Sequence, residues 1–133
     1  MLQRVKAFLK SRPQLYDLAK RLYRWGSFRT DPIYDFFDGF SKSHDRRVNF
    51  IQIGANDGLR SDPIRELIVR DFWQGVLIEP LPNVFSLLQH NYRHISPKRL
   101  TFVNAAITDG GDQNLTFWTY RSSFLKSLPL ELR

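Results

Sequence analysis

Two short apolar runs, each closed by a turn and separated by one helical pattern, constrain the fold of this chain most strongly. The first run reads VNFIQI over residues 48–53, and the second reads GVLI over residues 75–78. Short runs rich in β-branched residues and closed by glycine are typical of strands buried on both faces of a parallel sheet. The stretch from residue 48 to residue 80 therefore predicts a βαβ unit.

The helical pattern between the two runs has a clear start. Asp62 reads as an N-cap and Pro63 as the first helical residue. Apolar residues then recur on one side at helical spacing, namely Ile64, Leu67, Ile68 and Phe72. We expect this helix to cover one face of the sheet.

The turn after the first run reads GANDG over residues 54–58. Gly54 and Gly58 can take positive φ and bring the backbone close to a ligand, and Asn56 also tolerates the left-handed region. Glu79 ends the second run, where a carboxylate can accept the hydroxyls of a ribose. Because the loop lacks the third glycine of the dinucleotide fingerprint, its spacing alone also fits an ordinary turn with a surface glutamate.

Three motifs in order carry a family resemblance. They are IGANDG at residues 53–58, IEPLPNVF at 78–85 followed by Leu87, Leu88 and Asn91, and VNAAI at 103–107. Together they resemble the FkbM family of S-adenosylmethionine-dependent methyltransferases. The resemblance covers about residues 48–120 and does not extend to the first forty-odd residues.

This resemblance implies a class I methyltransferase fold, a Rossmann-like α/β fold with a doubly wound sheet. It also implies S-adenosylmethionine as cofactor, with the glycine-rich loop under its methionine part. The residues expected to bind the cofactor are Gly54, Ala55, Asn56, Asp57, Gly58, Glu79, Pro80, Asn104 and Ala105. The role of Asp57 stays open, because the family often has an apolar residue at that position. No catalytic residue can be named.

The rest of the domain supplies a third strand over residues 100–107, whose end at Asn104, Ala105 and Ala106 should reach the same edge of the sheet. A turn at 109–112 precedes an alternating segment at 115–120, which predicts an extra strand antiparallel to the third. We expect an incomplete sheet, formed by the N-terminal half of a methyltransferase domain over residues 47–133. The first strand would then have an unpaired edge prone to self-association.

Residues 1–46 predict a basic helical extension and linker. Residues 1–30 hold eight Lys or Arg against one acid, Asp17, which accounts for the net charge of +7. Two amphipathic patterns flank Pro13, and one side of the second contains Leu15, Leu18, Ala19, Leu22 and Tyr23. Such helices fit either an anionic membrane surface or packing against the domain or a second subunit. They do not favour nucleic-acid binding, because the aromatic residues lie on the apolar side.

Metal and disulfide chemistry find little support. The chain has no cysteine, and His90 and His94 read as solvent-facing residues of one helix without a third ligand. Asp31 and Pro32 open another helix, which runs through Ile33, Phe36, Phe37 and Phe40. The polar residues 41–47 read as a linker into the first strand.

The family resemblance thus implies a methyltransferase that acts on the hydroxyl of a sugar or natural product. We expect it in the cytoplasm, either free or peripheral to the inner face of a membrane through residues 1–30. Two alternatives stay open. One is an NAD(P)-binding Rossmann-type oxidoreductase domain, and the other is a non-catalytic membrane-surface or interaction module.

Overall fold

The computed structural model describes residues 8, 11–26, 31–60, 62–110 and 115–119. Its helices are α2 (Pro13–Gly26), α3 (Pro32–Ser43), α4 (Arg65–Arg70) and α5 (Pro82–Tyr92), and its strands are β1 (Asn49–Ile53), β2 (Gln74–Ile78) and β3 (Leu100–Val103). The strands form one parallel sheet in the order β1-β2-β3. This arrangement confirms the predicted α/β class and the βαβ unit.

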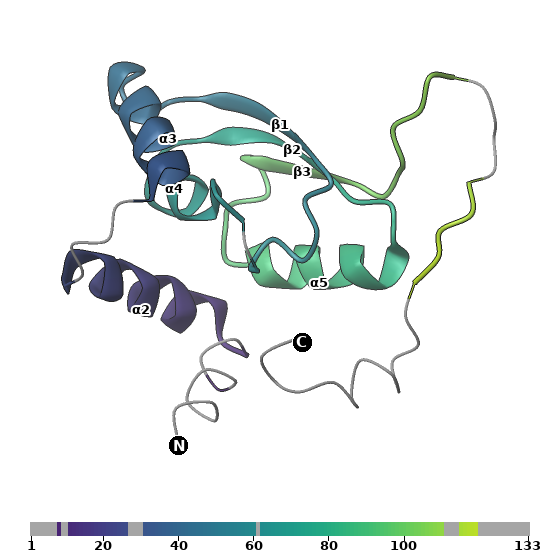
Figure 1. The fold of residues 1–133 in the computed structure, drawn as a ribbon, viewed down its shortest axis with the longest axis horizontal. Coiled ribbons are helices and arrows are strands. Elements are labelled where there is room, and N and C mark those ends of the chain that lie inside the picture. The colour runs from purple at the N-terminus through teal and green to yellow at the C-terminus, as the bar shows by residue number, and fades with distance from the viewer. Residues whose placement is uncertain (1–7, 9–10, 27–30, 61, 111–114, 120–133) are drawn as a thin grey trace.

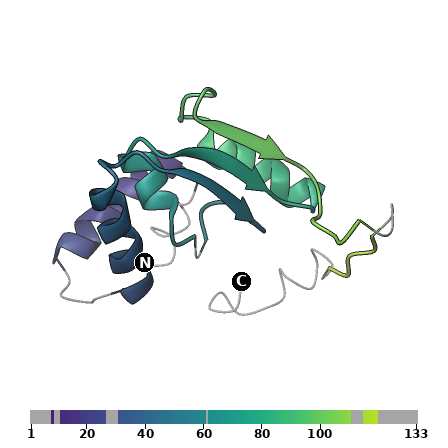
Figure 2. The ribbon, with the colours of Figure 1, turned by 90° about the horizontal axis from the view of Figure 1, so that it is seen from above.

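Both crossover connections place their helices on the same face of the sheet (Figures 1 and 2). This placement follows from topology, because β1 to β2 and β2 to β3 step in the same direction and parallel crossovers are right-handed. The register aligns Ile53 with Ile78, and Ile78 with Val103. The carboxyl ends of all three strands therefore meet at one edge.

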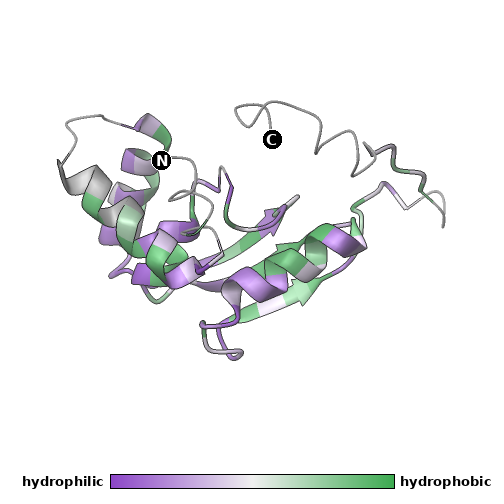
Figure 3. Cartoon of the chain, turned by 90° about the horizontal axis from the view of Figure 1, so that it is seen from below, coloured by the Kyte–Doolittle hydropathy of each residue, from purple (hydrophilic) through white to green (hydrophobic). Residues whose placement is uncertain are grey.

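The core lies between the sheet and helices α4 and α5. Leu77 of β2 is fully buried against Leu67 and Ile68 of α4 and Leu88 and Tyr92 of α5. In Figure 3, hydrophobic colour runs along the sheet, whereas α5 carries both colours.

The opposite face of the sheet is open in the part of the chain that the structure describes. Ile51 and Ile53 are 70% and 64% exposed, and Figure 2 shows no described helix over this face of the sheet. A hollow of about 450 Å³ also runs beside β1, lined in part by Phe37, Phe40 and Trp73. Parallel sheets are normally covered on both faces, and this one is not in the described residues. Self-association through β1 stays a prediction.

The edge of β1 is equally unpaired among the described residues. Val48 O accepts from Gln74 N, and Gly54 N donates to Ile78 O, each at 2.9 Å. In a parallel pair this pattern directs the backbone groups of alternate residues, such as Ile51, away from the neighbouring strand.

The extra strand predicted after the third is wrong. Residues 115–119 form no strand, and Trp118 is 93% exposed; residue 120 lies outside the described residues. The third strand also ends at Val103 rather than at residue 107. Alternation alone does not hold a strand in place when neither face of the segment finds packing partners.

The helix predicted from Pro63 begins two residues later, at Arg65. The predicted N-cap at Asp62 is therefore wrong, because the N-cap is Ile64 and has no side-chain cap. Asp62 lies two residues earlier, where its Oδ1 accepts from Ile64 N at 3.0 Å and Arg65 N at 3.1 Å. Phe72, predicted on the buried side, follows the helix and is exposed. The buried carboxylate of Asp62 also accepts from the Tyr92 hydroxyl at 3.0 Å, which ties the start of α4 to α5.

Helix α3 begins as predicted, with Asp31 accepting from Tyr34 N at 3.3 Å. Its buried side carries Tyr34 and Ser41, whereas Phe36 on the predicted apolar side is exposed. Ser41 was expected to open a linker, yet it is fully buried. Its hydroxyl donates to Asp71 Oδ2 at 2.5 Å and accepts from Trp73 Nε1 at 2.9 Å.

Asp71 is the centre of a charged cluster where α3 meets the end of α4. Arg70 donates to it through Nε and Nη2, each at 2.7 Å, and Arg46 donates through Nη1 at 3.1 Å. Burial by itself raises the pKa of Asp71. The hydrogen bonds from Arg70 and Ser41, together with the charge of Arg70, outweigh it and lower this pKa to about 2.

We predict that Asp71→Asn lowers the free energy of unfolding by about 2 kcal/mol at neutral pH. A lowered folded-state pKa stabilises the fold at pH values above 3.8, the ordinary pKa of an aspartate, and this contribution disappears as the pH falls toward 2. Urea unfolding followed by circular dichroism should therefore show the difference from wild type shrinking over that range. The exposed Asp35→Asn serves as control, and an equal loss in both variants would contradict the assignment.

Candidate functional site

The glycine-rich loop is fastened to the end of β2. Gly54 N and Ala55 N both donate to Ile78 O at 2.9 Å. Asn56 N donates to Glu79 Oε2 at 3.0 Å. The structure thus brings the predicted loop and the predicted carboxylate together.

The residues after β3 reach the same edge. Glu79 N donates to Val103 O at 3.1 Å. The side-chain amide of Asn104 donates to Glu79 O at 2.7 Å and to Pro80 O at 3.0 Å. Ala105, which is half-buried, follows directly. All three predicted segments therefore meet at one edge of the sheet.

Glu79 is only 5% exposed, and both of its carboxylate oxygens are engaged. Oε2 holds the loop through Asn56, and Oε1 accepts from Leu81 N at 3.0 Å. A carboxylate offers about four acceptor positions, of which these N–H groups use two. The described hydrogen bonds of Glu79 therefore fasten the loop and use only part of its acceptor capacity.

The two loop glycines serve different purposes. Gly54 has φ +71° and Gly58 has φ +63°, as predicted for residues in the left-handed region. A Cβ at Gly54 would meet nothing within 4 Å, whereas one at Gly58 would lie 2.5 Å from Tyr92 Cε2 and 2.6 Å from Leu88 Cδ1. Gly58 is needed so that the loop can pack against α5, rather than to make room for a ligand.

Asn56 and Asp57 shape the loop through their side chains. Asn56 has φ 51° and accepts from Asp57 N through Oδ1 at 2.7 Å. Asp57 Oδ1 accepts from Leu59 N at 3.0 Å and Arg60 N at 2.8 Å, while Asp57 O accepts from the Asn91 amide at 2.8 Å. The buried Asp57, whose role the sequence left open, thus caps the turn that ends the loop.

Beneath the loop lies a guanidinium that sequence reasoning missed. Arg65 is 1% exposed and donates through Nη1 to Gly58 O at 2.6 Å and through Nη2 to Asn91 O at 3.1 Å. It also forms a bidentate pair with Asp17 of α2, at 2.7 and 2.9 Å. Its guanidinium carbon stands 4.6 Å from the centre of the Tyr92 ring. Arg65 therefore joins the loop, α5 and α2.

The charge of Arg65 is secured by this pairing. Burial is the largest single effect and lowers the pKa of Arg65. The hydrogen bonds to Asp17 and the charges of Tyr92, Asp17 and Asp62 together outweigh burial, so the pKa is raised. The sequence offered one signal, since Asp17 is the single acid of a basic segment. Arg65 itself gave a weaker signal. It is a cation three residues before Ile68, and residues at that spacing lie on the same side of a helix.

Because Asp17 faces the domain, the apolar side of α2 faces outward. Leu15, Leu18 and Leu22 are 39%, 50% and 57% exposed. The packing of α2 on α4 agrees with the predicted helical extension on the domain. The side of the helix that makes this contact contains the buried Pro13 and Asp17 rather than the leucines.

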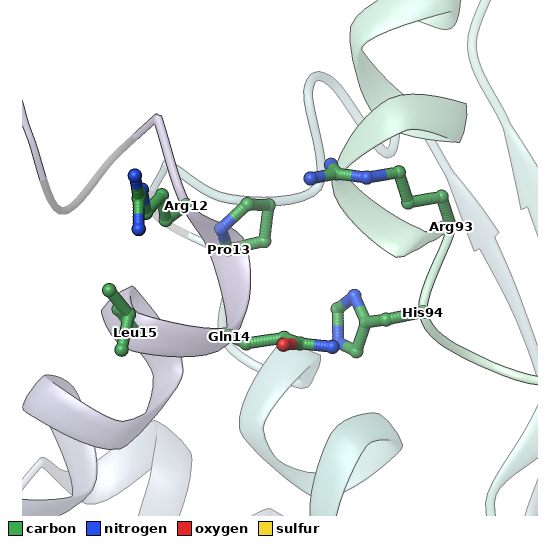
Figure 4. Close-up of a pocket in the computed structure, with 6 residues that line it drawn as sticks. All are labelled: Arg12, Pro13, Gln14, Leu15, Arg93 and His94. Atoms are coloured by element: carbon green, nitrogen blue, oxygen red, sulfur yellow. The ribbon is translucent and has the colours of Figure 1, made fainter.

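A second hollow, of about 440 Å³, separates the start of α2 from the end of α5 (Figure 4). It is lined by Arg12, Pro13, Gln14, Leu15, Arg93 and His94. His94 lies beyond α5 and is largely buried, so its predicted solvent-facing position on that helix is wrong. Burial and the charge of Arg65 lower the pKa of His94, whose Nε2 lies 3.8 Å from Asp17 Oδ2.

Among the described residues, no group of three or more His, Asp or Glu side chains could hold a metal ion. Within that same part of the chain, no helix is long and apolar enough to cross a membrane. Comparison with family models, curated proteins and solved structures found no match to this chain.

We predict that Gly58→Ala destabilises the fold more than Gly54→Ala. Both variants place a Cβ at positive φ, which costs about 1 kcal/mol. Gly58→Ala should cost roughly 1–3 kcal/mol more, since its Cβ overlaps Tyr92 and Leu88. Urea unfolding of the two variants tests this, and equal losses would show that the loop does not pack on α5 in this way.

We predict that Asp17→Asn costs about 3 kcal/mol in stability, because it leaves the buried Arg65 without its counter-charge. It should also speed hydrogen–deuterium exchange in residues 54–60, because Arg65 holds this loop through its hydrogen bond to Gly58 O. Asp38→Asn is the matched control, since Asp38 pairs with Arg70 at 2.6 Å away from the loop. Unchanged exchange in the loop, or an equal increase in the control, would contradict this role.

Proposed function

We propose that this chain forms the cofactor-binding part of an S-adenosylmethionine-dependent methyltransferase with a class I, Rossmann-like fold. The observation that carries the proposal is the buried carboxylate of Glu79, which ends β2 and holds the loop that follows β1. Ligands of open α/β sheets bind outside the carboxyl ends of the strands, where an acidic residue on the second strand accepts ribose hydroxyls.

The residues at this edge suit the parts of the cofactor. Glu79 keeps acceptor positions for the ribose. Gly54, at which even a Cβ would meet nothing within 4 Å, leaves space above the loop for the methionine part. Asn104 and Ala105 flank the edge from β3, where a small side chain admits a flat ring. The fit therefore rests on residues of all three strand ends.

S-adenosylmethionine supplies an activated methyl group on its sulfonium, so the protein mainly has to hold that group in line with the acceptor. We propose a hydroxyl of a sugar or other small molecule as acceptor, in keeping with the family resemblance of the motifs. The chain contributes orientation through the loop and Glu79, and we assign no base.

We further propose that β1 is an internal strand of the working enzyme. Its edge, which no other described strand pairs, and the exposed Ile51 and Ile53 are features that parallel sheets normally cover. Further strands and helices beside β1 would bury both and would bring the acceptor site.

Calorimetry with S-adenosylhomocysteine, and with NAD as competing ligand class, tests the proposed function. We expect binding of S-adenosylhomocysteine in preference to NAD, and the reverse preference would favour the oxidoreductase alternative. Glu79→Gln should weaken binding by roughly 1.5–3 kcal/mol, since it removes a charged acceptor.

The ribose role needs a control, because Glu79→Gln also disturbs the loop. The 2′-deoxy analogue of S-adenosylhomocysteine should bind wild type more weakly than the parent ligand. In Glu79→Gln the two ligands should bind nearly equally, because the partner of the hydroxyl is gone. An undiminished preference for the parent ligand would show that Glu79 only holds the loop.

A further inference from the structure

We propose that the outward side of α2 docks onto a membrane surface rich in anionic phospholipid. This inference does not depend on the methyltransferase proposal. It rests on an exposed leucine ridge, defined as Leu15, Leu18 and Leu22, and on the basic hollow at one end of that ridge.

The leucine ridge is exposed on the outer side of α2. The three leucines recur at i, i+3 and i+7 and are all exposed, while Asp17 between them points to Arg65 inside the domain. The bidentate pair fixes the rotation of α2. An amphipathic helix held in this way presents its apolar side as a fixed surface, which suits the boundary between headgroups and acyl chains.

Cations adjoin the ridge. Leu15 lines the same hollow as Arg12, Arg93 and His94, and Figure 4 shows Arg93 extending from the end of α5 toward the start of α2. Arg12 and Arg93 are both exposed. A headgroup phosphate entering the hollow would meet two guanidinium groups beside the apolar ridge.

Charge also selects among possible occupants. Residues 1–30 carry eight Lys or Arg, and their single acid, Asp17, is already neutralised by Arg65. A second copy of α2 would bring the same positive charge and would be repelled. An anionic lipid surface can bury the leucines and attract the cations at the same time. Each Lys or Arg near such a surface strengthens binding about fivefold.

Vesicle flotation of the whole chain tests the proposal, since floated vesicles separate bound protein from aggregates. The vesicles are phosphatidylcholine alone or phosphatidylcholine with about 30 mol% phosphatidylserine. We expect binding only to the anionic vesicles. Leu18→Ser with Leu22→Ser should weaken it at least tenfold, and Arg12→Gln with Arg93→Gln about tenfold or more.

Two matched controls keep the test specific. Ile33→Ser with Phe36→Ser removes an equally exposed apolar pair from α3, and Arg47→Gln with Lys98→Gln removes the same charge elsewhere. Neither should change binding by more than about twofold. Equal losses in test and control variants, or no flotation with anionic vesicles, would overturn the proposal.

Two further results would point to other occupants and would equally overturn it. One is a ridge variant that lowers the oligomeric state in the absence of lipid, which would indicate a second copy. The other is millimolar inorganic phosphate that abolishes flotation while the ridge variant floats normally, which would indicate a free-anion pocket. Circular dichroism of each variant confirms that the fold is kept.

Discussion

The buried pair between Arg65 and Asp17 is the interaction on which the rest of this structure depends. A guanidinium that is 1% exposed must be paired, because removing one partner of a buried ion pair costs roughly 3–5 kcal/mol. Arg65 pairs with Asp17 and also donates to Gly58 O and Asn91 O. One side chain of α4 thus joins the N-terminal helix, the glycine-rich loop and α5.

Two consequences follow from this pair. The loop between β1 and α4 is held from below by Arg65 and from the side by Glu79, so a ligand would not have to order it on binding, which favours affinity. Helix α2 turns its acid inward, so its leucine ridge faces outward. The site at the strand ends and the surface of α2 are therefore set by the same contact.

Local patterns predicted the frame of the fold well. The runs at 48–53 and 75–78 and the start of α3 at Asp31 depend on neighbours in sequence, and the structure agrees with them. The positive φ of Gly54, Asn56 and Gly58 was also predictable, because those residue types tolerate it. The convergence of the strand ends followed from parallel topology alone.

Contacts between distant segments were not predictable in the same way. Asp17 and Arg65 are far apart in sequence, and an amphipathic pattern cannot say whether the apolar side of a helix meets its own domain. The packing reason for Gly58 likewise depends on Tyr92 and Leu88 of another helix. The strand predicted at 115–120 was wrong for the opposite reason. Residues 115–119 have the alternating pattern of a strand, but they are exposed and pack against no described segment.

The central claim is that the loop held by Glu79 and Arg65 receives an S-adenosyl ligand at the strand ends. Amide chemical-shift mapping by NMR with S-adenosylhomocysteine tests it most directly. The account predicts that the shifted amides belong to residues 54–57, to Leu81 and to Ala105, with α2 unaffected. Shifts confined to the hollow beside Arg12 and His94, or to the open face around Ile51, would contradict it.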